Sequence, residues 1–72
     1  MVQYRDDILL KKIAKKLRLL RNQLELTLEE VYNDIDVHVG RIESGNTNIS
    51  VSTLAKICKY YKISLVDFFK DL

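Results

Sequence analysis

The chain has 72 residues, of which 47% are hydrophobic and 31% charged, and its formal net charge is +2 at pH 7. This composition is typical of one small globular domain and excludes a disordered chain. Its apolar runs are too short for a membrane span or a signal-peptide core, so we expect a cytoplasmic protein. With a single cysteine, Cys58, and no proline, an internal disulfide is excluded and a turn-rich β architecture is disfavoured.

The first helix is predicted over residues 8–23, behind a lead that shows no periodicity. We expect residues 1–7 to be a flexible lead and residues 8–72 to form the domain. An apolar stripe at helical spacing marks the buried side of the helix, with lysines on the other side. The stripe consists of Ile13, Leu17, Leu20 and Leu24.

Two short helices joined by a tight turn are predicted over residues 26–45. Thr27 is a candidate N-cap, and Glu30, three residues later, completes a capping box. The helical spacing of apolar residues in the first of these helices does not continue into the second, and Asp36 is a candidate N-cap for the second helix. Gly45 is expected to end that helix, because glycine readily adopts a positive φ. The two helices together are typical of a helix-turn-helix.

Two further helices complete a bundle of five. A polar loop at residues 46–49 leads to Ser50, which is expected to cap a helix over residues 51–61. The last helix is expected to start at Ser64, with Asp67 as the acid of a second capping box. The inward face of the first of these two helices should carry Leu54, Ile57, Cys58 and Tyr61.

Six short motifs follow one another along most of the chain. They are Leu17-x-x-Leu20-Arg21, Leu26-Thr27-x-Glu29-Glu30-Val31, Arg41-Ile42-Glu43-x-Gly45, Asn48-Ile49-Ser50, Thr53-Leu54-x-Lys56-Ile57 and Ile63-Ser64-Leu65. As an ordered set they resemble the phage-repressor (Cro/XRE-like) helix-turn-helix family. The resemblance implies an all-α fold, a compact five-helix bundle of the phage-repressor helix-turn-helix type. It also implies a DNA-binding transcriptional regulator.

The resemblance assigns candidate DNA contacts to both helices of the motif and to the loop that follows. In the family, the second helix enters the major groove and reads base edges, while the first helix and nearby loops hold phosphates. On the second helix the exposed residues are His38, Gly40 and Arg41, and arginine has the fork geometry for a guanine edge. The backbone contacts are then assigned to Thr27, Ser44, Asn46 and Asn48. The partner implied is double-stranded DNA.

The chain departs from the family pattern at two places. It has fewer residues between Ile35 and Val39, and it has Leu28 where the family commonly has a glutamine that contacts a phosphate. A shortened helix of about two turns, ~12 Å, can still enter the groove. We therefore expect modest sequence specificity, or readout shared with a loop, another segment or DNA shape.

The resemblance also implies an internal brace and a dimer. Arg21 and Glu43 occupy positions that pair in family members, and we expect a structural ion pair between them. A homodimer would bind a palindromic operator with half-sites one helical turn apart, ~34 Å. The last helix is the expected dimer seam, through Leu65, Phe68, Phe69 and Leu72. Covering a promoter would make the protein a repressor, while activation stays open.

Catalysis is not expected, because the chain has no glycine-rich phosphate loop, no nucleophile–His–acid set and no Cys/His metal spacing. We therefore expect no metal and no cofactor, and no effector site is evident. Arg41 and His38 also fit plain exposed positions without a ligand. An alternative function is a protein-interaction module, antitoxin-like, on a helix-turn-helix scaffold. In that reading, an exposed Leu28 belongs to a protein interface.

Overall fold

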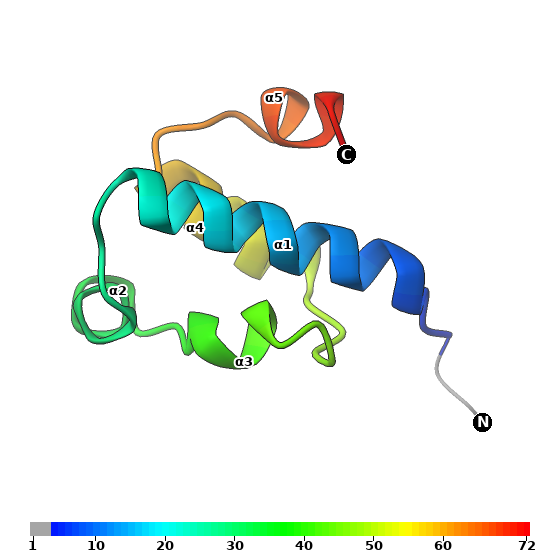
Figure 1. Ribbon diagram of the computed structural model, residues 1–72, viewed down its shortest axis with the longest axis horizontal. Helices are drawn as coiled ribbons and strands as arrows, with labels where there is room; N and C mark the ends of the chain where they lie inside the picture. The colour runs from blue at the N-terminus through cyan, green and yellow to red at the C-terminus, as the bar shows by residue number, and fades with distance from the viewer. Residues whose placement is uncertain (1–3) are drawn as a thin grey trace.

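The chain folds around its longest helix, α1 (Asp7–Gln23), which crosses the middle of the molecule in Figure 1. The structure is a computed structural model that describes residues 4–72. Within these residues four shorter helices follow and no strand occurs, so the predicted all-α bundle is confirmed. They are α2 (Leu28–Ile35), α3 (Val39–Glu43), α4 (Val51–Tyr60) and α5 (Leu65–Lys70). No helix in this part of the chain has the length and hydropathy that a bilayer crossing needs.

Short polar side chains explain where four of these helices begin. Each accepts a hydrogen bond from a backbone N–H of the first turn, a donor that has no partner within its helix. The capping residues are Asp6 for α1, Thr27 for α2, Ser50 for α4 and Ser64 for α5. Thr27 and Glu30 form the predicted capping box. At Ser64, the described residues show the bond from the Asp67 N–H but not the reciprocal bond from its carboxylate.

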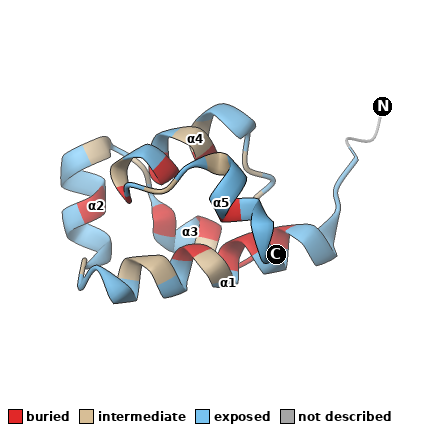
Figure 2. Cartoon of the chain, turned by 90° about the horizontal axis from the view of Figure 1, so that it is seen from above, coloured by how far each residue is buried: buried red, intermediate tan, exposed pale blue. Residues whose placement is uncertain are grey.

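One apolar core joins all five helices, and Figure 2 shows the buried positions on their inner sides. The buried members of this core are Ile13, Leu17, Val31, Val39, Ile42, Leu54, Ile57, Cys58, Tyr61 and Phe68. The predicted inward face of α4 is therefore confirmed. The predicted stripe of α1 is wrong at Leu24, which is 46% exposed. Leu24 is the C-cap of α1 and keeps the helical hydrogen bond to the Leu20 carbonyl oxygen, but at this end of the helix it is not among the residues packed against the core.

The described part of the N-terminal lead is anchored rather than loose. Asp7 already belongs to α1, and Asp6 is its N-cap. The Arg5 side chain donates a hydrogen bond to the Asn46 carbonyl oxygen, and the Asn48 side chain donates one to the Tyr4 carbonyl oxygen at 3.3 Å. The lead is thus held against the loop that follows α3. The first three residues of the predicted lead lie outside the described residues.

Candidate nucleic-acid interface

The turn between α2 and α3 differs from the one that the sequence predicts. Asp36 does not cap α3; it ends α2 in the left-handed conformation, with φ 58° and ψ 39°. Its N–H donates to the Tyr32 carbonyl oxygen at 2.8 Å. His38 takes the N-cap position of α3 and makes no side-chain capping bond there. The prediction for Asp36 is wrong because aspartate suits both an N-cap and a left-handed turn, and here the turn prevails.

The second helix of the motif is very short. α3 has five residues, about 7.5 Å of helix, compared with the ~12 Å expected from the sequence. Val39 and Ile42 are 1% and 7% exposed and face the core. Gly40 and Arg41 are exposed between them, and His38 is exposed just before the helix. α3 therefore presents few side chains to a ligand.

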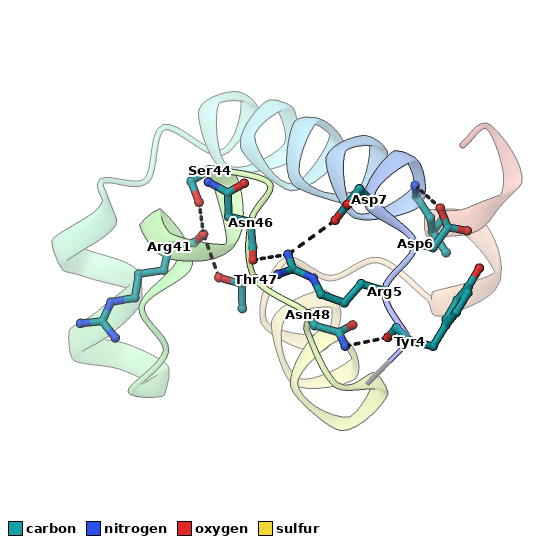
Figure 3. A network of polar contacts seen from close by, with 10 residues as sticks. Tyr4, Arg5, Asp6, Asp7, Arg41, Ser44, Asn46, Thr47 and Asn48 are labelled. Atoms are coloured by element: carbon teal, nitrogen blue, oxygen red, sulfur yellow. Dashed lines mark hydrogen bonds and ion pairs between the residues drawn. The ribbon is translucent and has the colours of Figure 1, made fainter. Parts of the chain in front are cut away.

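Arg41 is an exposed residue of α3, and in Figure 3 its side chain points away from the other residues drawn. Its guanidinium makes no hydrogen bond or ion pair with any residue of the described chain, so its donors remain available to a ligand. The Arg41 backbone, in contrast, is held in place. Its carbonyl oxygen accepts hydrogen bonds from the hydroxyls of Ser44 and Thr47, the latter at 3.1 Å. The start of the side chain is fixed while its charged end is free.

The loop after α3 contains three of the four residues predicted to contact the DNA backbone. Each of them makes a different hydrogen bond within the protein. Ser44 uses its hydroxyl on Arg41, as described above. Asn46 accepts a hydrogen bond from Arg5 with its backbone carbonyl oxygen, and its side-chain amide makes no hydrogen bond among residues 4–72 (Figure 3). Asn48 uses its side-chain amide on the Tyr4 carbonyl oxygen. The loop is therefore held by these contacts, and Ser44, Asn46 and Asn48 are exposed residues within it.

Two basic residues that the sequence did not single out lie beside this loop. Arg5 reaches it directly through Asn46. Lys11 packs against it as well, since a Cβ placed on Gly45 would lie 3.2 Å from Lys11 Cγ. Arg5 and Lys11 are far from the loop in sequence, and no local pattern predicts that they meet it. They bring positive charge to the end of α3.

Thr27 lies at the start of α2, where its polar atoms serve the helix. Its Oγ1 accepts from the Glu30 N–H and its own N–H donates to Glu30 Oε1, both at 3.1 Å. The hydroxyl proton of Thr27 is still available to a phosphate oxygen. The two first-turn acids, Glu29 and Glu30, add negative charge near that position.

His38 and Gly40 contact side chains of α2. The His38 ring stacks on the Tyr32 ring, with centroids 4.3 Å apart and an interplanar angle of 25°. At Gly40 the Leu28 side chain covers the backbone, and an added Cβ would lie 3.3 Å from Leu28 Cδ1. The structure thus places two predicted DNA contacts beside an apolar and an aromatic side chain of α2.

The ion pair expected between α1 and α3 is present and largely buried. Arg21 donates from Nε to Glu43 Oε2 at 2.8 Å and from Nη2 to Glu43 Oε1 at 2.9 Å. A third bond runs from Arg21 Nη1 to the Leu26 carbonyl oxygen at 2.8 Å. The hydrogen bonds to Glu43 raise the pKa of Arg21 above its ordinary value. This pair fixes the end of α3 against α1.

The residues of the predicted dimer seam differ in how far they are buried. Phe68 has no exposed surface and belongs to the core of its own protomer, where Lys16 Nζ lies 5.3 Å from its ring centroid. Phe69 is 43% exposed, and Leu65 and Leu72 are half-buried. Phe68 is therefore not accessible to a partner, because its ring is part of the core that joins the five helices.

The comparison with known families supplies the identification. A family model described as helix-turn-helix matches residues 17–68, from the middle of α1 to α5. The chain belongs to this helix-turn-helix family, the Cro/C1 type. The comparisons with curated proteins and with solved structures produced no match.

Within this helix-turn-helix domain, α2 and α3 are the two helices of the motif. The family is one of DNA-binding regulatory domains and is not typically enzymatic, which makes the chain a DNA-binding helix-turn-helix regulator. Among residues 4–72, no three His, Cys, Asp or Glu side chains gather as metal ligands would. Burial raises the pKa of the Cys58 thiol, which favours its neutral form.

Proposed function

We propose that the chain is a sequence-selective transcriptional regulator that acts as a homodimeric repressor on a palindromic operator. The observation that carries the proposal is the Arg41 guanidinium, which extends from α3 without a protein partner among residues 4–72 (Figure 3). Arginine can donate two parallel hydrogen bonds to O6 and N7 of guanine in the major groove. Because its backbone is held by Ser44 and Thr47, the side chain starts from a defined position.

Phosphate binding falls to the loop after α3 and to the basic residues beside it. In this proposal Ser44, Asn46 and Asn48 present amides and hydroxyls to the DNA backbone, and Arg5 and Lys11 supply positive charge. Such contacts set the register of a protein on the duplex without reading its sequence. Thr27 contributes a further contact from the start of α2.

The sequence specificity of this interface is modest, because α3 is only five residues long and Val39 and Ile42 face the core. Arg41 reads one base directly and His38 is the second candidate. The remaining selectivity comes from the shape and deformability of the operator, which phosphate contacts detect.

The dimer seam of this proposal lies on α5. Phe69 provides its exposed aromatic surface, with Leu65 and Leu72 at its margins, since Phe68 is occupied by the core. Two copies related by a two-fold axis would place their α3 helices in successive major grooves, ~34 Å apart. A dimer that covers a promoter in this way excludes polymerase by steric competition.

The proposal is tested by fluorescence anisotropy of the purified chain with a pool of random duplex DNA across a salt series. We expect binding that weakens steeply with salt, because each phosphate contact releases counterions. Selection from the same pool should then enrich a palindrome, and sedimentation should show a dimer on it. Absence of binding at low salt would overturn the proposal.

A further inference from the structure

A small apolar surface is exposed where α2 meets α3. We call it the Leu28 surface and define it by Leu28, Tyr32, His38 and Gly40. Leu28 and Tyr32 are 45% and 39% exposed, and their spacing of four residues places them on one side of α2. Tyr32 stacks on His38 and Leu28 covers Gly40, so the four residues are continuous.

The stretch of chain that carries the Leu28 surface holds only acidic charges, and the first basic residue after it is Arg41, next to Gly40. Residues 22–40 contain five carboxylates and no lysine or arginine. The five acids are Glu25, Glu29, Glu30, Asp34 and Asp36, and all are exposed. Glu30 is engaged by the capping box and Asp34 by the Tyr60 hydroxyl. Glu25, Glu29 and Asp36 remain to interact with a ligand.

This electrostatic setting disfavours DNA phosphate on the exposed side of α2 beyond its N-cap, so the α2 contribution to phosphate binding is limited to Thr27. Glu29 and Glu30 lie in the first turn of α2, where they offset the positive end of the helix dipole. Next to these acids the exposed side chain is Leu28, which has no hydrogen-bond donor for a phosphate oxygen. The basic residues near α3, Arg5 and Lys11, lie at the opposite end, beside the loop.

We propose that the Leu28 surface is a docking site for a basic amphipathic segment of a partner protein. Apolar side chains of the partner pack on Leu28 and Tyr32, and its lysines or arginines face Glu25, Glu29 and Asp36. An amphipathic segment that lays its apolar side on such a surface is a recurring mode of recognition. The charge complementarity is what selects a basic protein segment over nucleic acid.

The position of this surface has a regulatory consequence. Leu28 packs on Gly40, the neighbour of Arg41 in α3, so a docked segment covers α3. Partner and DNA therefore exclude each other, and the partner acts as an antagonist. This last step rests on the proposed DNA-binding function, whereas the docking site itself does not.

The test uses the ¹⁵N-labelled chain and two synthetic helical peptides with leucines at the same positions. One peptide carries lysine at every polar position and the other carries glutamate. We expect the lysine peptide alone to shift the amide resonances of residues 28, 32, 38 and 40. The proposal is overturned if both peptides bind equally, or if the shifts map to another surface.

Two variants of exposed leucines make the test specific. Leu28→Lys should weaken binding of the lysine peptide by about tenfold or more, as expected for a residue at the centre of a docking site. Leu19→Lys is the matched control, because Leu19 is 52% exposed on α1, and it should leave peptide affinity within about twofold. Retained dispersion of the amide spectrum shows that each variant is folded. Glu29→Lys provides a second, charge-only variant that should also weaken binding.

DNA binding of the same variants separates this inference from the proposed function. Leu28→Ala should lose peptide affinity and keep DNA affinity. A different pair of results would overturn the inference: Leu28→Ala loses DNA affinity, and the native chain does not bind the lysine peptide. The Leu28 surface would then contact DNA rather than a partner protein. If the native chain binds the lysine peptide at this surface but no DNA, the docking site stands and the proposed function fails.

Discussion

Gly45 and Lys11 are in contact although they lie on opposite sides of the helix-turn-helix motif in the sequence. Gly45 has φ +82°, and a Cβ added there would lie 3.2 Å from Lys11 Cγ and 3.7 Å from Lys11 Cα. The position therefore combines a left-handed backbone with a close approach to α1. The left-handed backbone is the condition that favours glycine, while an added Cβ would also require the Lys11 side chain to shift by a few tenths of an ångström.

Gly45→Ala should consequently lower the free energy of unfolding by about 1–2 kcal/mol, the cost of holding alanine in the left-handed region. Urea denaturation followed by circular dichroism measures this change. Gly40→Ala is the matched control, because its added Cβ meets only the end of the flexible Leu28 side chain, at 3.3 Å. Its effect should stay within about 1 kcal/mol, since alanine favours a helix. A larger loss for Gly40→Ala would contradict this account.

Removing one partner of the Arg21–Glu43 pair should destabilise the fold. The two side chains are 13% and 8% exposed, so Glu43→Ala leaves a nearly buried guanidinium without its carboxylate. We expect a loss of ~3 kcal/mol in thermal or chemical denaturation. The double variant Arg21→Ala/Glu43→Ala should lose less than the sum of the two single variants, because no unpaired charge remains.

The exposed Arg5–Asp7 pair is the control for this prediction. Its atoms are 3.6 Å apart and its side chains are 43% and 70% exposed. Asp7→Ala should cost under ~1 kcal/mol, as solvent screens the pair. Equal losses for Glu43→Ala and Asp7→Ala would mean that the Arg21–Glu43 pair does not brace α3 against α1.

Arg41→Ala should weaken binding to a selected operator by about 1–3 kcal/mol and relax the preference at one base position. The reason is that Arg41 is the free guanidinium of α3. Anisotropy titrations against operators with single base changes measure both effects. Arg18→Ala, an exposed arginine on α1, should leave the base preference unchanged. An unaltered preference for Arg41→Ala would remove Arg41 from the interface.

Tyr61 should make the fold sensitive to alkaline pH. Burial raises the pKa of Tyr61 from 10.0 to about 12, so between these pH values the unfolded chain loses a proton that the folded chain keeps. Stability therefore falls as the pH rises through this range. Part of the loss should persist in Tyr61→Phe, because a hydrogen bond to Asp34 also raises the pKa of Tyr60 to about 12.

Tyr61→Phe should reduce this alkaline loss and should be tolerated at neutral pH. The Tyr61 hydroxyl is buried without a hydrogen-bond partner among the described residues, so its removal costs no bond. The unfolding free energy at pH 7 should change by under ~1 kcal/mol or rise. Urea titrations at pH 7 and pH 11 compare the two chains. A pH dependence identical to that of the native chain would contradict the role given to Tyr61.

Features set by neighbouring residues could be predicted from the sequence. The caps at Thr27, Ser50 and Ser64 depend on one side chain and the next turn of backbone, and each starts its helix as predicted. The inward face of α4 follows from helical spacing alone. Composition, capping residues and helical spacing predicted the all-α bundle with a helix-turn-helix, and the family resemblance agreed; both predictions are confirmed.

Features that depend on competing local choices or on distant contacts could not be predicted. Asp36 can cap a helix or turn left-handed, and only the packing of α3 decides between them. Arg5 meets Asn46 across 41 positions, which no periodicity encodes. Phe68 and Phe69 are adjacent aromatics at the same predicted seam, yet one is buried and the other exposed, since α5 turns only one inward.

If Arg41 reads DNA as proposed, the shortness of α3 makes that recognition depend on the packing of the protein interior. Five residues are too few for a helix that stands alone in water, so α3 keeps its shape only while Val39 and Ile42 remain packed. The surface that carries Arg41 is thus the outer side of a core element. Altered packing behind α3 would reposition Arg41, and substitutions that never touch DNA would change operator affinity. Selection for a stable interior and selection for an operator therefore act on the same few residues.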